Sequence, residues 1–463
     1  MTGRRSPAPD DRPVALTVAG SDAGGGAGVQ ADLAAMAAGG AFPTSVVTAV
    51  TAQNTRGVES VHVVPTAEVA AQFDAVAGDF DLRAAKTGML ATAEVVDLVA
   101  DRAADLDCPV VVDPVMVAAS GDRLLDRDAE RAYDALVAEA ALVTPNLDEA
   151  AVLTDVAADA LAAEGVEGQV AAGEALIDSG ARAALVKGGH ARGDVVRDVL
   201  VTEAGARTFE HPRVDTEATH GSGCVLSSAV AARLARGDGL ESAVRSATAG
   251  MERAVRYHYD VGDGPGPVNP LAGLRERAAR DPTAEAVESV VRGFVERDVS
   301  PLVPEVGMNV VGATPYAEDP AETAAVEGRI TRTLAGVKPN RGVRFGASSH
   351  VARFLLAARE HDPSLRFAVN CRYDAAVDDA LDALSGPVAS YDRGEEPDAV
   401  KAEEGSTMAW GADRAFASVE GTPVAVADPG EVGKEPVVKL LASDAETLLA
   451  RTDRLLGALD AVR

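Results

Sequence analysis

Cysteine is scarce in this chain of 463 residues, where only Cys108, Cys224 and Cys371 occur. Three widely spaced thiols build neither a disulfide framework nor a CxxC-type metal site. No run of 18 apolar residues occurs, and the polar stretch 1–12 lacks the apolar segment of a secretory signal. We therefore expect a cytoplasmic protein in a reducing compartment, with no membrane role.

Positive charge is also in short supply. The chain has 43 basic against 72 acidic residues, a formal net charge of −29, which repels polyanions and excludes duplex nucleic acid as an expected partner. Six of the basic residues are lysines and 37 are arginines, so each remaining lysine is a candidate for function. Excess acid with little lysine suits solubility in molar salt, and we expect a salt-rich cytoplasm. Activity that is maximal at low ionic strength and falls with added KCl would contradict this hypothesis.

Apolar residues make up 47% of the chain, enough for two to four domains with buried cores. From Pro13 to about Tyr259, short β-branched runs alternate with alanine-rich amphipathic stretches. The expected strands include residues 16–18, 45–50, 110–112, 142–144 and 183–187. The expected helices include residues 68–77, 94–104, 128–138 and 223–235. This alternation predicts a mainly parallel sheet with helices on both faces and ligands at the carboxyl ends of its strands.

A domain boundary is expected after residues 262–270, where three glycines and three prolines interrupt regular structure. A charged helical stretch of roughly residues 271–297 follows, and a second α/β pattern begins near Val299. We expect one domain over residues 13–265 and another over residues 284–463.

The glycine loop Gly20–Gly28 follows the first strand and opens a helix near Val29. Its GxGxxA spacing is a poor match to a dinucleotide fingerprint, because the glycines lie too far beyond the strand. A flexible connection explains this loop equally well by itself. A loop of this kind bearing Asp22 also lets backbone approach a small ring.

His220-Gly-Ser-Gly-Cys224 precedes another expected helix. Its small residues let the amides of 221–224 point at one place, where the helix N-terminus adds positive potential, so we expect an oxyanion or phosphate pocket. Such a pocket lowers the pKa of the Cys224 thiol below its reference of about 8.5. On spacing alone, a helix cap with a buried small thiol is the better interpretation.

Other polar residues follow neighbouring expected strands. The NxxE spacing of Asn146 and Glu149 presents an amide and a carboxylate toward a hydrated Mg²⁺. Asp113 and Lys187 each stand at an expected carboxyl strand end. No Walker A sequence is present, so phosphoryl transfer requires a different scaffold.

Seven motifs of this half occur in a fixed order: AGSDAGGGAGVQADL, TAVTAQNT, KTGML, DPVM, TPNLDEA, VKGGH and HGSGCVLSSAVAA. Over about residues 13–259 they resemble the hydroxymethylpyrimidine and phosphomethylpyrimidine kinases of the ribokinase-like fold. The resemblance implies phosphorylation of 4-amino-5-hydroxymethyl-2-methylpyrimidine, and then of its monophosphate, by ATP with Mg²⁺.

The same resemblance implies roles for individual residues. The pyrimidine-contacting positions are Gly20, Asp22, Gln53 and Met89. The amides of Gly221, Ser222, Gly223 and Cys224 stabilise the transferred phosphoryl group, and Lys187 neutralises nucleotide phosphate. Cys224 takes the hydroxyl proton as a thiolate. Mg²⁺ is organised by Asn146 and Glu149, with Asp113 nearby.

The C-terminal half has its own motifs. Phe345–His350 precedes an apolar-periodic helix that Ser348 and Ser349 can cap, and its loop can receive an anion. A lone histidine at a helix start is more often simply solvated. Lys434, one of the six lysines, lies in a glycine- and proline-flanked loop.

The GRI, FGASSH, DRGEEP and GKEP blocks resemble, in order, the archaeal-type thiamine-phosphate synthase domain. The resemblance implies a three-layer α/β/α fold similar to the class II aldolase/adducin domain, and condensation of the pyrimidine diphosphate with hydroxyethylthiazole phosphate. Arg329 and His350 match its active residues, and Lys434 is assigned to phosphate. Pro429 stands where the family has an arginine, a contact that Arg393 could supply instead.

Two alternatives remain open at this stage. The C-terminal domain could be a ligand sensor, although no DNA-reading module is evident. The kinase could act on pyridoxal or another small alcohol. A homodimer is expected from the fold, but the sequence shows no interface.

Overall fold

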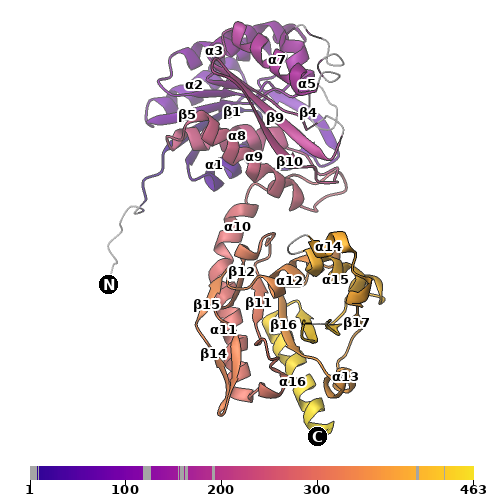
Figure 1. Ribbon diagram of the computed structural model, residues 1–463. Coiled ribbons are helices and arrows are strands. Elements are labelled where there is room, and N and C mark those ends of the chain that lie inside the picture. The colour runs from indigo at the N-terminus through magenta and orange to yellow at the C-terminus, as the bar shows by residue number, and fades with distance from the viewer. Residues whose placement is uncertain are drawn as a thin grey trace, which may run out of the picture. The chain divides into compact units, whose positions relative to one another are not determined.

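The computed structural model describes residues 8, 10–117, 127–154, 156, 161, 165–189, 193–402, 406–431 and 433–462. The chain forms two compact units, residues 1–273 and 274–463, each with its own sheet (Figure 1). Among the helices described, none is both long and apolar enough to cross a membrane.

The first unit is built on an eight-stranded sheet in the order β10-β9-β8-β7-β6-β5-β1-β2. Its strands are β1 (Val14–Ala19), β2 (Phe42–Val47), β5 (Leu82–Thr87), β6 (Val110–Val112), β7 (Leu142–Val143), β8 (Ala183–Val186), β9 (Val195–Thr202) and β10 (Gly205–Pro212). The six neighbouring strands β2, β1, β5, β6, β7 and β8 pair in parallel, whereas β9 and β10 run antiparallel at one edge. The mainly parallel sheet predicted from the alternating pattern is confirmed.

Helices cover both faces of this sheet because its central strands are apolar on both sides. In β6, Val110 and Val112 face one core cluster and Val111 faces the other. One face is covered by α1 (Gly28–Ala38), α8 (Ser222–Ala235) and α9 (Leu240–Arg256). The opposite cluster draws on α2 (Thr66–Ala77), α3 (Ala93–Ala104), η1 (Arg127–Ala132), α4 (Tyr133–Ala138) and α7 (Val166–Asp178).

Two sequence-based expectations change in detail. The strand predicted over residues 45–50 is divided: β2 ends at Val47, and Ala49 begins a hairpin of β3 (Ala49–Asn54) and β4 (Gly57–Val63). Between them, buried Thr48 donates its hydroxyl to the Met89 carbonyl at 2.7 Å, which holds the chain where it leaves the sheet. The helix predicted over residues 128–138 begins as the 3₁₀ turn η1 and becomes α-helical only in α4.

The second unit has a seven-stranded sheet in the order β15-β12-β11-β16-β19-β18-β17. Its strands are β11 (Val310–Ala313), β12 (Thr323–Val326), β15 (Val343–Phe345), β16 (Phe367–Arg372), β17 (Val388–Ser390), β18 (Ala425–Asp428) and β19 (Val437–Ala442). Only β17 and β18 pair in parallel among these described strands. A separate hairpin joins β13 (Ile330–Thr333) and β14 (Gly336–Pro339).

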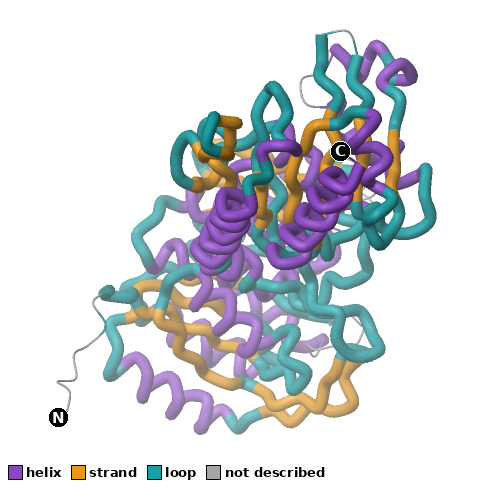
Figure 2. The backbone as a smooth tube through the Cα atoms, turned by 90° about the horizontal axis from the view of Figure 1, so that it is seen from below, coloured by secondary structure: helices purple, strands orange, loops and turns teal. Residues whose placement is uncertain are grey.

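Helices again lie on both faces, which makes three layers (Figure 2 colours helices purple and strands orange). One core cluster includes residues of α11 (Arg280–Arg297), α13 (Ala375–Leu381) and α16 (Ala445–Val462). The other includes α12 (His350–His361) and α15 (Ser406–Ala417). Among the residues that the structure describes, the other helical segments are α5 (Leu147–Thr154) in the first unit, α10 (Ala272–Ala278) at the boundary of the two units, and, in the second unit, α14 (Asp398–Ala402), η2 (Ser300–Leu302), η3 (Pro320–Glu322) and η4 (Arg393–Glu395). The likeness to the aldolase/adducin domain stays a prediction.

Candidate active sites

Asp22 organises the glycine loop that follows β1. Its Oδ2 accepts the backbone N–H groups of Gly26 (3.0 Å) and Ala27 (2.8 Å), and its Oδ1 accepts Gly24 N–H (2.8 Å). His220 Nε2 lies 3.1 Å from the same Oδ2. Burial opposes ionisation, but these hydrogen bonds outweigh it and lower the pKa of Asp22. The side chain thus also shapes the loop, and the pyrimidine contact expected of Asp22 stays a prediction.

The other residues expected around the pyrimidine do meet. Gly20 N–H donates to the Met89 carbonyl at 3.1 Å, and a Cβ on Gly20 would lie 3.0 Å from Met89 Sδ. Thr51 Oγ1 lies 3.4 Å from Gln53 Oε1 and 2.8 Å from the Ser21 carbonyl, which ties the β3 hairpin to this loop. Met89 also joins a small apolar cluster. These contacts bring Gly20 and Met89 together and tie the hairpin that carries Gln53 to the same loop, and the pyrimidine contacts expected of these residues stay a prediction.

The two glycine-rich loops touch where only glycine fits. A Cβ on Gly221, whose φ is +78°, would lie 1.9 Å from the Gly26 carbonyl oxygen. A Cβ on Gly26 would lie 2.5 Å from the His220 ring. The loop after β1 and the N-terminus of α8 are thereby brought together, although 194 residues separate them in the chain from Gly26 to His220.

Lys187 and Asp113 lie beside the first turn of α8. Lys187 Nζ is 3.0 Å from Asp113 Oδ1, and a Cβ on Gly223 would lie 3.2 Å from that ammonium. Ser227 Oγ and Thr144 Oγ1 also donate to Asp113, at 3.3 Å and 3.2 Å. Burial disfavours the charged lysine, but Asp113 and Glu149 outweigh it and raise the pKa of Lys187. The carboxyl ends of β6 and β8 therefore present a fixed cation at a helix N-terminus, a good arrangement for phosphate.

Asn146 and Glu149, the NxxE pair, cap the start of a helix, a role that their spacing alone did not predict. Asn146 Oδ1 accepts Glu149 N–H, and Glu149 Oε2 accepts Asn146 N–H, both at 2.8 Å. This reciprocal capping box begins α5 and uses one oxygen of each side chain. Glu149 Oε2 also lies 3.8 Å from Lys187 Nζ. In the described part of the chain, no group of three or more His, Cys, Asp or Glu side chains could hold a metal by itself.

Cys224 departs from its expected chemistry. Burial raises the pKa of its thiol to about 11, and the carboxylates of Asp32 and Asp113 raise it further, whereas Lys86 lowers it. The expected lowering of this pKa is therefore wrong for the protein without ligands. The sequence shows that Cys224 lies at a helix N-terminus, which lowers the pKa of a thiol. The burial and the carboxylates that raise this pKa come from residues distant in the sequence.

One of the scarce lysines, Lys86, has a partner that the motifs and their spacing did not predict. Lys86 and Asp32 are both 0% exposed, and Lys86 Nζ lies 2.9 Å from each Asp32 oxygen. An acidic residue inside the apolar stretch ADLAAMAA was the available signal for this pair. Of the six lysines, Lys86, Lys187 and Lys439 are largely buried, and the other three are exposed.

In the second unit, Arg329 occupies a constrained turn. Its φ of +69° is unusual for a residue with a side chain, and Arg329 Nη1 donates to the Val306 carbonyl. The buried Asn309 amide exchanges two 3.0 Å hydrogen bonds with the backbone of Val326, just before this turn. Asn370 Oδ1 in turn accepts Asn309 N–H at 2.7 Å. Two buried amides thus fix the strand from which the exposed arginine projects.

His350, the first residue of α12, faces several cations. Partial burial and then the positive charges of Arg329, Arg353, Arg393 and Lys439 lower the pKa of His350, which favours the neutral imidazole. The expected pair of Arg329 and His350 therefore shares one electrostatic environment. In a chain of net charge −29, these basic residues are a local concentration of positive charge, part of which Asp428 balances.

A buried network lies next to this basic cluster. Arg393 Nε and Nη2 fork onto Asp428 at 2.7 Å and 2.6 Å, and Tyr391 donates its hydroxyl to Asp428 at 2.6 Å. Lys439 Nζ is 3.4 Å from Asp428 Oδ2 and lies over the Phe354 ring. Asp428 thereby engages two of the three guanidinium nitrogens of Arg393, and the phosphate contact expected of Arg393 stays a prediction.

Lys434 also differs from expectation. It is half-exposed, and its Nζ pairs with Glu431 Oε1 at 2.7 Å across a tight turn. The ammonium that acts on His350 comes instead from Lys439, which is 3% exposed. The phosphate-binding role expected of Lys434 stays a prediction.

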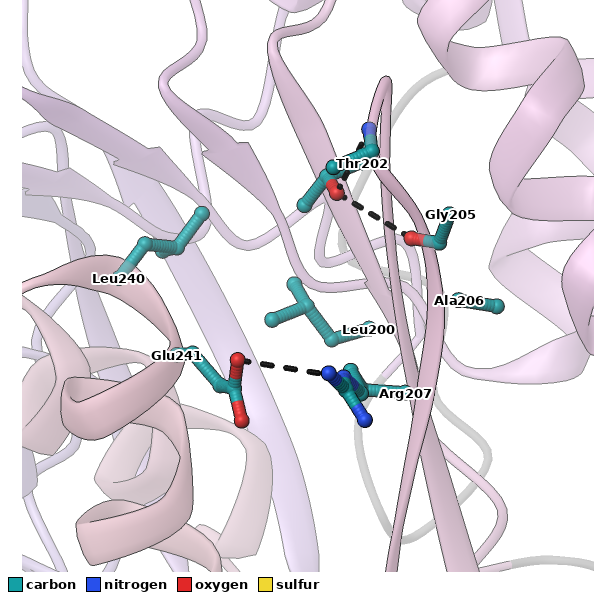
Figure 3. A pocket seen from close by; sticks show the side chains of 8 residues that line it. Leu200, Thr202, Gly205, Ala206, Arg207, Leu240 and Glu241 are labelled. Carbon is teal, nitrogen blue, oxygen red and sulfur yellow. Dashed lines mark hydrogen bonds and ion pairs between the residues drawn. The ribbon is translucent and has the colours of Figure 1, made fainter.

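A surface hollow of about 340 Å³ lies apart from these residues, between the β9–β10 hairpin and the start of α9 (Figure 3). Arg207 faces Glu241 across it at 4.0 Å, and Thr202 donates to the Gly205 carbonyl at 3.2 Å. Neither pair carries a nucleophile or a free cation. We assign this hollow no catalytic role.

The first unit thus combines a ribokinase-like α/β fold, two glycine-rich loops in contact and a buried lysine beside a helix N-terminus, an arrangement typical of a small-molecule kinase. Residues 22–269, more than half of the chain, match the family model for phosphomethylpyrimidine kinase, and the chain belongs to that family. Residues 286–454 match the model for thiamine-phosphate synthase ThiN. The chain is therefore a bifunctional enzyme of thiamine biosynthesis, as the motif order predicted.

Individual relatives agree with this membership. The hydroxymethylpyrimidine/phosphomethylpyrimidine kinase of Streptomyces coelicolor is 46% identical over 258 residues, covering 56% of this chain and 94% of that protein. The thiamine biosynthesis bifunctional protein ThiED of Geobacter sulfurreducens is 45% identical, covering 58% of this chain and 54% of its own. The ADP complex of Bacillus subtilis pyridoxal kinase superposes with a TM-score of 0.52 at 29% identity, over 57% of this chain and 99% of that one.

Proposed function

We propose that the first unit transfers the γ-phosphoryl group of ATP to the hydroxymethyl oxygen of 4-amino-5-hydroxymethyl-2-methylpyrimidine, and then phosphorylates the monophosphate. The observation that carries this proposal is the Lys187–Asp113 pair beside the first turn of α8. It provides fixed positive charge where the glycine loop of Asp22 meets His220 and Gly221. In the transition state of the transfer, the phosphoryl group carries negative charge between two oxygens and needs positive charge beside it.

Each group has a defined task in the transfer. The hydroxymethyl oxygen forms a bond to the γ-phosphorus as the bond from phosphorus to the β-bridging oxygen breaks, and ADP leaves. Lys187 and the amides of Gly221–Gly223 stabilise the charge on the transferred oxygens. Asp113 holds Lys187 in place. Cys224 is assigned to accept the proton of the hydroxymethyl group, for which its thiol, whose pKa is raised in the protein without ligands, must first lose its own proton.

The polar residues near Lys187 are hard oxygen donors of the kind that suits a Mg²⁺ ion arriving with the nucleotide. The capping box engages the single side-chain oxygen of Asn146 and one oxygen of Glu149, and Lys187, Thr144 and Ser227 contact Asp113, so a bound Mg²⁺ would share these oxygens with their present partners. An incomplete set of protein ligands is usual when substrate phosphates supply the rest. Bound there, Mg²⁺ would neutralise phosphate charge.

An assay of the full chain with ATP, Mg²⁺ and the pyrimidine tests this function, with each phosphorylated product separated by chromatography. We expect the monophosphate first and the diphosphate next. In Cys224→Ala, loss of the proton acceptor should lower kcat by about 10²–10⁴-fold with little change in KM. Full activity in this variant would remove Cys224 from the mechanism.

We propose that the second unit joins the pyrimidine diphosphate to hydroxyethylthiazole phosphate. The thiazole nitrogen forms a bond to the pyrimidine methylene carbon, and the carbon–oxygen bond to pyrophosphate breaks. The cluster of cations around His350 supports this proposal, because departing pyrophosphate carries several negative charges. Supplying the diphosphate directly, without ATP, isolates this step in the full chain. Binding without formation of thiamine phosphate would favour a sensor domain.

Pyridoxal is a second candidate for the kinase. A solved pyridoxal kinase from Staphylococcus aureus, in complex with AMP-PCP and pyridoxal, is 28% identical with a TM-score of 0.52, over 57% of this chain and 96% of that chain. Both compounds are aromatic rings with a hydroxymethyl group. Comparing kcat/KM for the two compounds, each supplied alone with ATP, decides between them. We expect the pyrimidine to be preferred.

A further inference from the structure

Residues 259–268, the glycine- and proline-rich stretch near the end of the first unit, form a closed loop that we call the strap. Tyr259 N–H donates to the Pro267 carbonyl at 2.9 Å, which joins the two ends of the loop. A Cβ on Gly266 would lie 2.0 Å from the Tyr259 carbonyl oxygen, so the ends are in close contact. Because Pro265 and Pro267 restrict the backbone, the strap is stiffer than a linker of glycine and serine.

One end of the strap contacts both glycine-rich loops of the kinase site. Val268 N–H donates to the His220 carbonyl at 3.1 Å, beside a parallel bridge between His220 and Pro267. A Cβ on Gly26 would lie 2.7 Å from Pro267 Cβ. The strap is therefore fixed to the loop that follows β1 and to the loop that precedes α8.

The tip of the strap contacts the turn of the β3–β4 hairpin. Gly264 N–H donates to Thr55 Oγ1 at 3.1 Å. A Cβ on Gly264 would lie 2.0 Å from the Thr55 carbonyl oxygen, and one on Gly262 would lie 2.3 Å from Thr55 Oγ1. Only glycine lets the two segments approach this closely. Arg56 and Asp263 form an ion pair beside this contact, but both side chains are mostly exposed, so the pair contributes little.

The hairpin depends on contacts of this kind because it is a two-stranded sheet of its own, and such a sheet is marginally stable alone. Thr51 Oγ1 donates to the Ser21 carbonyl at 2.8 Å. Thr51 lies two residues before Gln53, and Thr55 lies two residues after it. The loop after β1 and the strap therefore hold the hairpin on either side of Gln53, the residue expected to read the edge of the pyrimidine.

We propose that the strap is a positioning element of the kinase, in which Thr55 and Gly264 are positioning residues that hold Gln53 at the edge of the bound ring. Substrate binding then does not have to order the hairpin, and this strengthens binding. The effect falls on binding of the pyrimidine, not on the transfer step. The inference rests on the proposed function, because it takes the pyrimidine as the ring beside Gln53.

Thr55→Val removes the hydroxyl that accepts Gly264 N–H and keeps the shape of the side chain. Steady-state kinetics of the full chain should show a KM for the pyrimidine that is about 3- to 10-fold higher, the effect of one hydrogen bond, with kcat and the KM for ATP little changed. Thr55→Ser keeps the hydroxyl and should retain the wild-type KM. Thr202→Val is the matched control, because its hydroxyl accepts Ala204 N–H at 3.3 Å in the β9–β10 turn, away from the kinase residues.

Gly264→Ala blocks the contact itself. The φ of Gly264 lies outside the left-handed region, so alanine suits the backbone there, but its methyl group meets the Thr55 backbone. We expect the KM for the pyrimidine to rise by about tenfold or more, because a methyl group without room forces the backbone to move. Gly250→Ala adds a methyl group with no atom within 4 Å and should retain the wild-type KM.

The double variant Thr55→Val/Gly264→Ala tests whether both substitutions act through one contact. Its KM should be no higher than that of Gly264→Ala, since the hydrogen bond is already lost there. Fully additive increases would show two independent defects and contradict the proposal. If Gly264→Ala does not fold, Thr55→Val and Thr55→Ser decide the proposal.

Amide hydrogen exchange measures the hairpin without any substrate. Peptides covering residues 49–63 should exchange faster in Thr55→Val and Gly264→Ala than in the wild type, and at the wild-type rate in Thr55→Ser. Unchanged exchange in the folded variants overturns the hold of the strap on the hairpin. Faster exchange with an unchanged KM overturns the positioning role while the kinase activity stands. A wild-type chain that does not phosphorylate the pyrimidine overturns the proposed function, and the positioning role with it.

Discussion

Lys187 Nζ lies 3.0 Å from Asp113 Oδ1, and both side chains are largely buried where a helix N-terminus meets the sheet edge. The pairing keeps a lysine charged without solvent around it. It also leaves the remaining ammonium protons free to meet phosphate, since Glu149 is more distant at 3.8 Å. This relationship joins two strand ends that are 74 residues apart.

Replacing Lys187 by methionine should remove that charge while keeping the length of the side chain. We expect kcat for pyrimidine phosphorylation to fall by about 10²–10³-fold, the usual effect of losing one group that stabilises transition-state charge. Steady-state kinetics measures this loss. Lys338→Met, at an exposed lysine of the second unit, is the matched control and should retain the wild-type rate.

Glu149→Gln should stabilise the ligand-free protein and impair the kinase. Burial raises the pKa of Glu149 to about 7, above the ordinary 4.5, so the folded state retains a proton that the unfolded state has lost. Stability therefore falls as the pH rises from about 4.5 to 7. Glutamine keeps the capping oxygen and cannot ionise, so the thermal midpoint at pH 8 should rise by a few degrees.

The same substitution should show a diminishing advantage at lower pH. Calorimetry at pH 5 should find a much smaller difference between Glu149→Gln and the wild type. A constant difference from pH 5 to pH 8 would contradict the role given to this carboxylate. The kinase rate should meanwhile fall at every pH, because the amide cannot supply a negative oxygen toward a cation.

Arg329→Ala and His350→Ala should separate the two activities of the chain. Each removes a group from the basic cluster of the second unit, and thiamine phosphate formation from supplied diphosphate should fall by about 10²-fold or more. Kinase turnover should be unchanged in both. Lys434→Met is the comparison variant for the same assay, and should lose less because its ammonium is paired with Glu431 in an exposed turn.

Asp428→Asn should destabilise the second unit at neutral pH. Despite burial, the hydrogen bonds from Arg393, the charge of Lys439 and the Tyr391 hydroxyl lower the pKa of Asp428 to about 2. Its stabilising effect is therefore present above its ordinary value of 3.8 and is lost as the pH falls through about 2. Removing this partner leaves two cations unpaired, at a cost of about 3 kcal/mol or more.

Denaturant titration at pH 7 should locate this loss in the second unit, with the kinase activity of the first unit preserved. Tyr391→Phe removes one hydrogen bond but no charge, and should cost about 1 kcal/mol. Equal losses for the two variants would show that the carboxylate charge has no special importance.

Local sequence patterns predicted much of the fold and part of the kinase site. Apolar β-branched runs alternating with amphipathic stretches predicted the parallel sheet, because each element must bury its apolar side against the next layer. Strand ends predicted where Asp113 and Lys187 would lie, since parallel strands present their carboxyl ends at one edge. Motif order predicted both families.

Tertiary structure decided the properties that depend on distant neighbours. The Asn146–Glu149 spacing is equally compatible with a metal site and a capping box, and only the folded backbone shows which bonds form. The Cys224 thiol pKa depends on burial and on carboxylates brought in from other elements. Lys86 finds Asp32 only when β5 and α1 meet. Chain pattern specifies which faces are apolar, whereas burial, hydrogen-bond occupancy and charge pairing exist only between elements that have packed together.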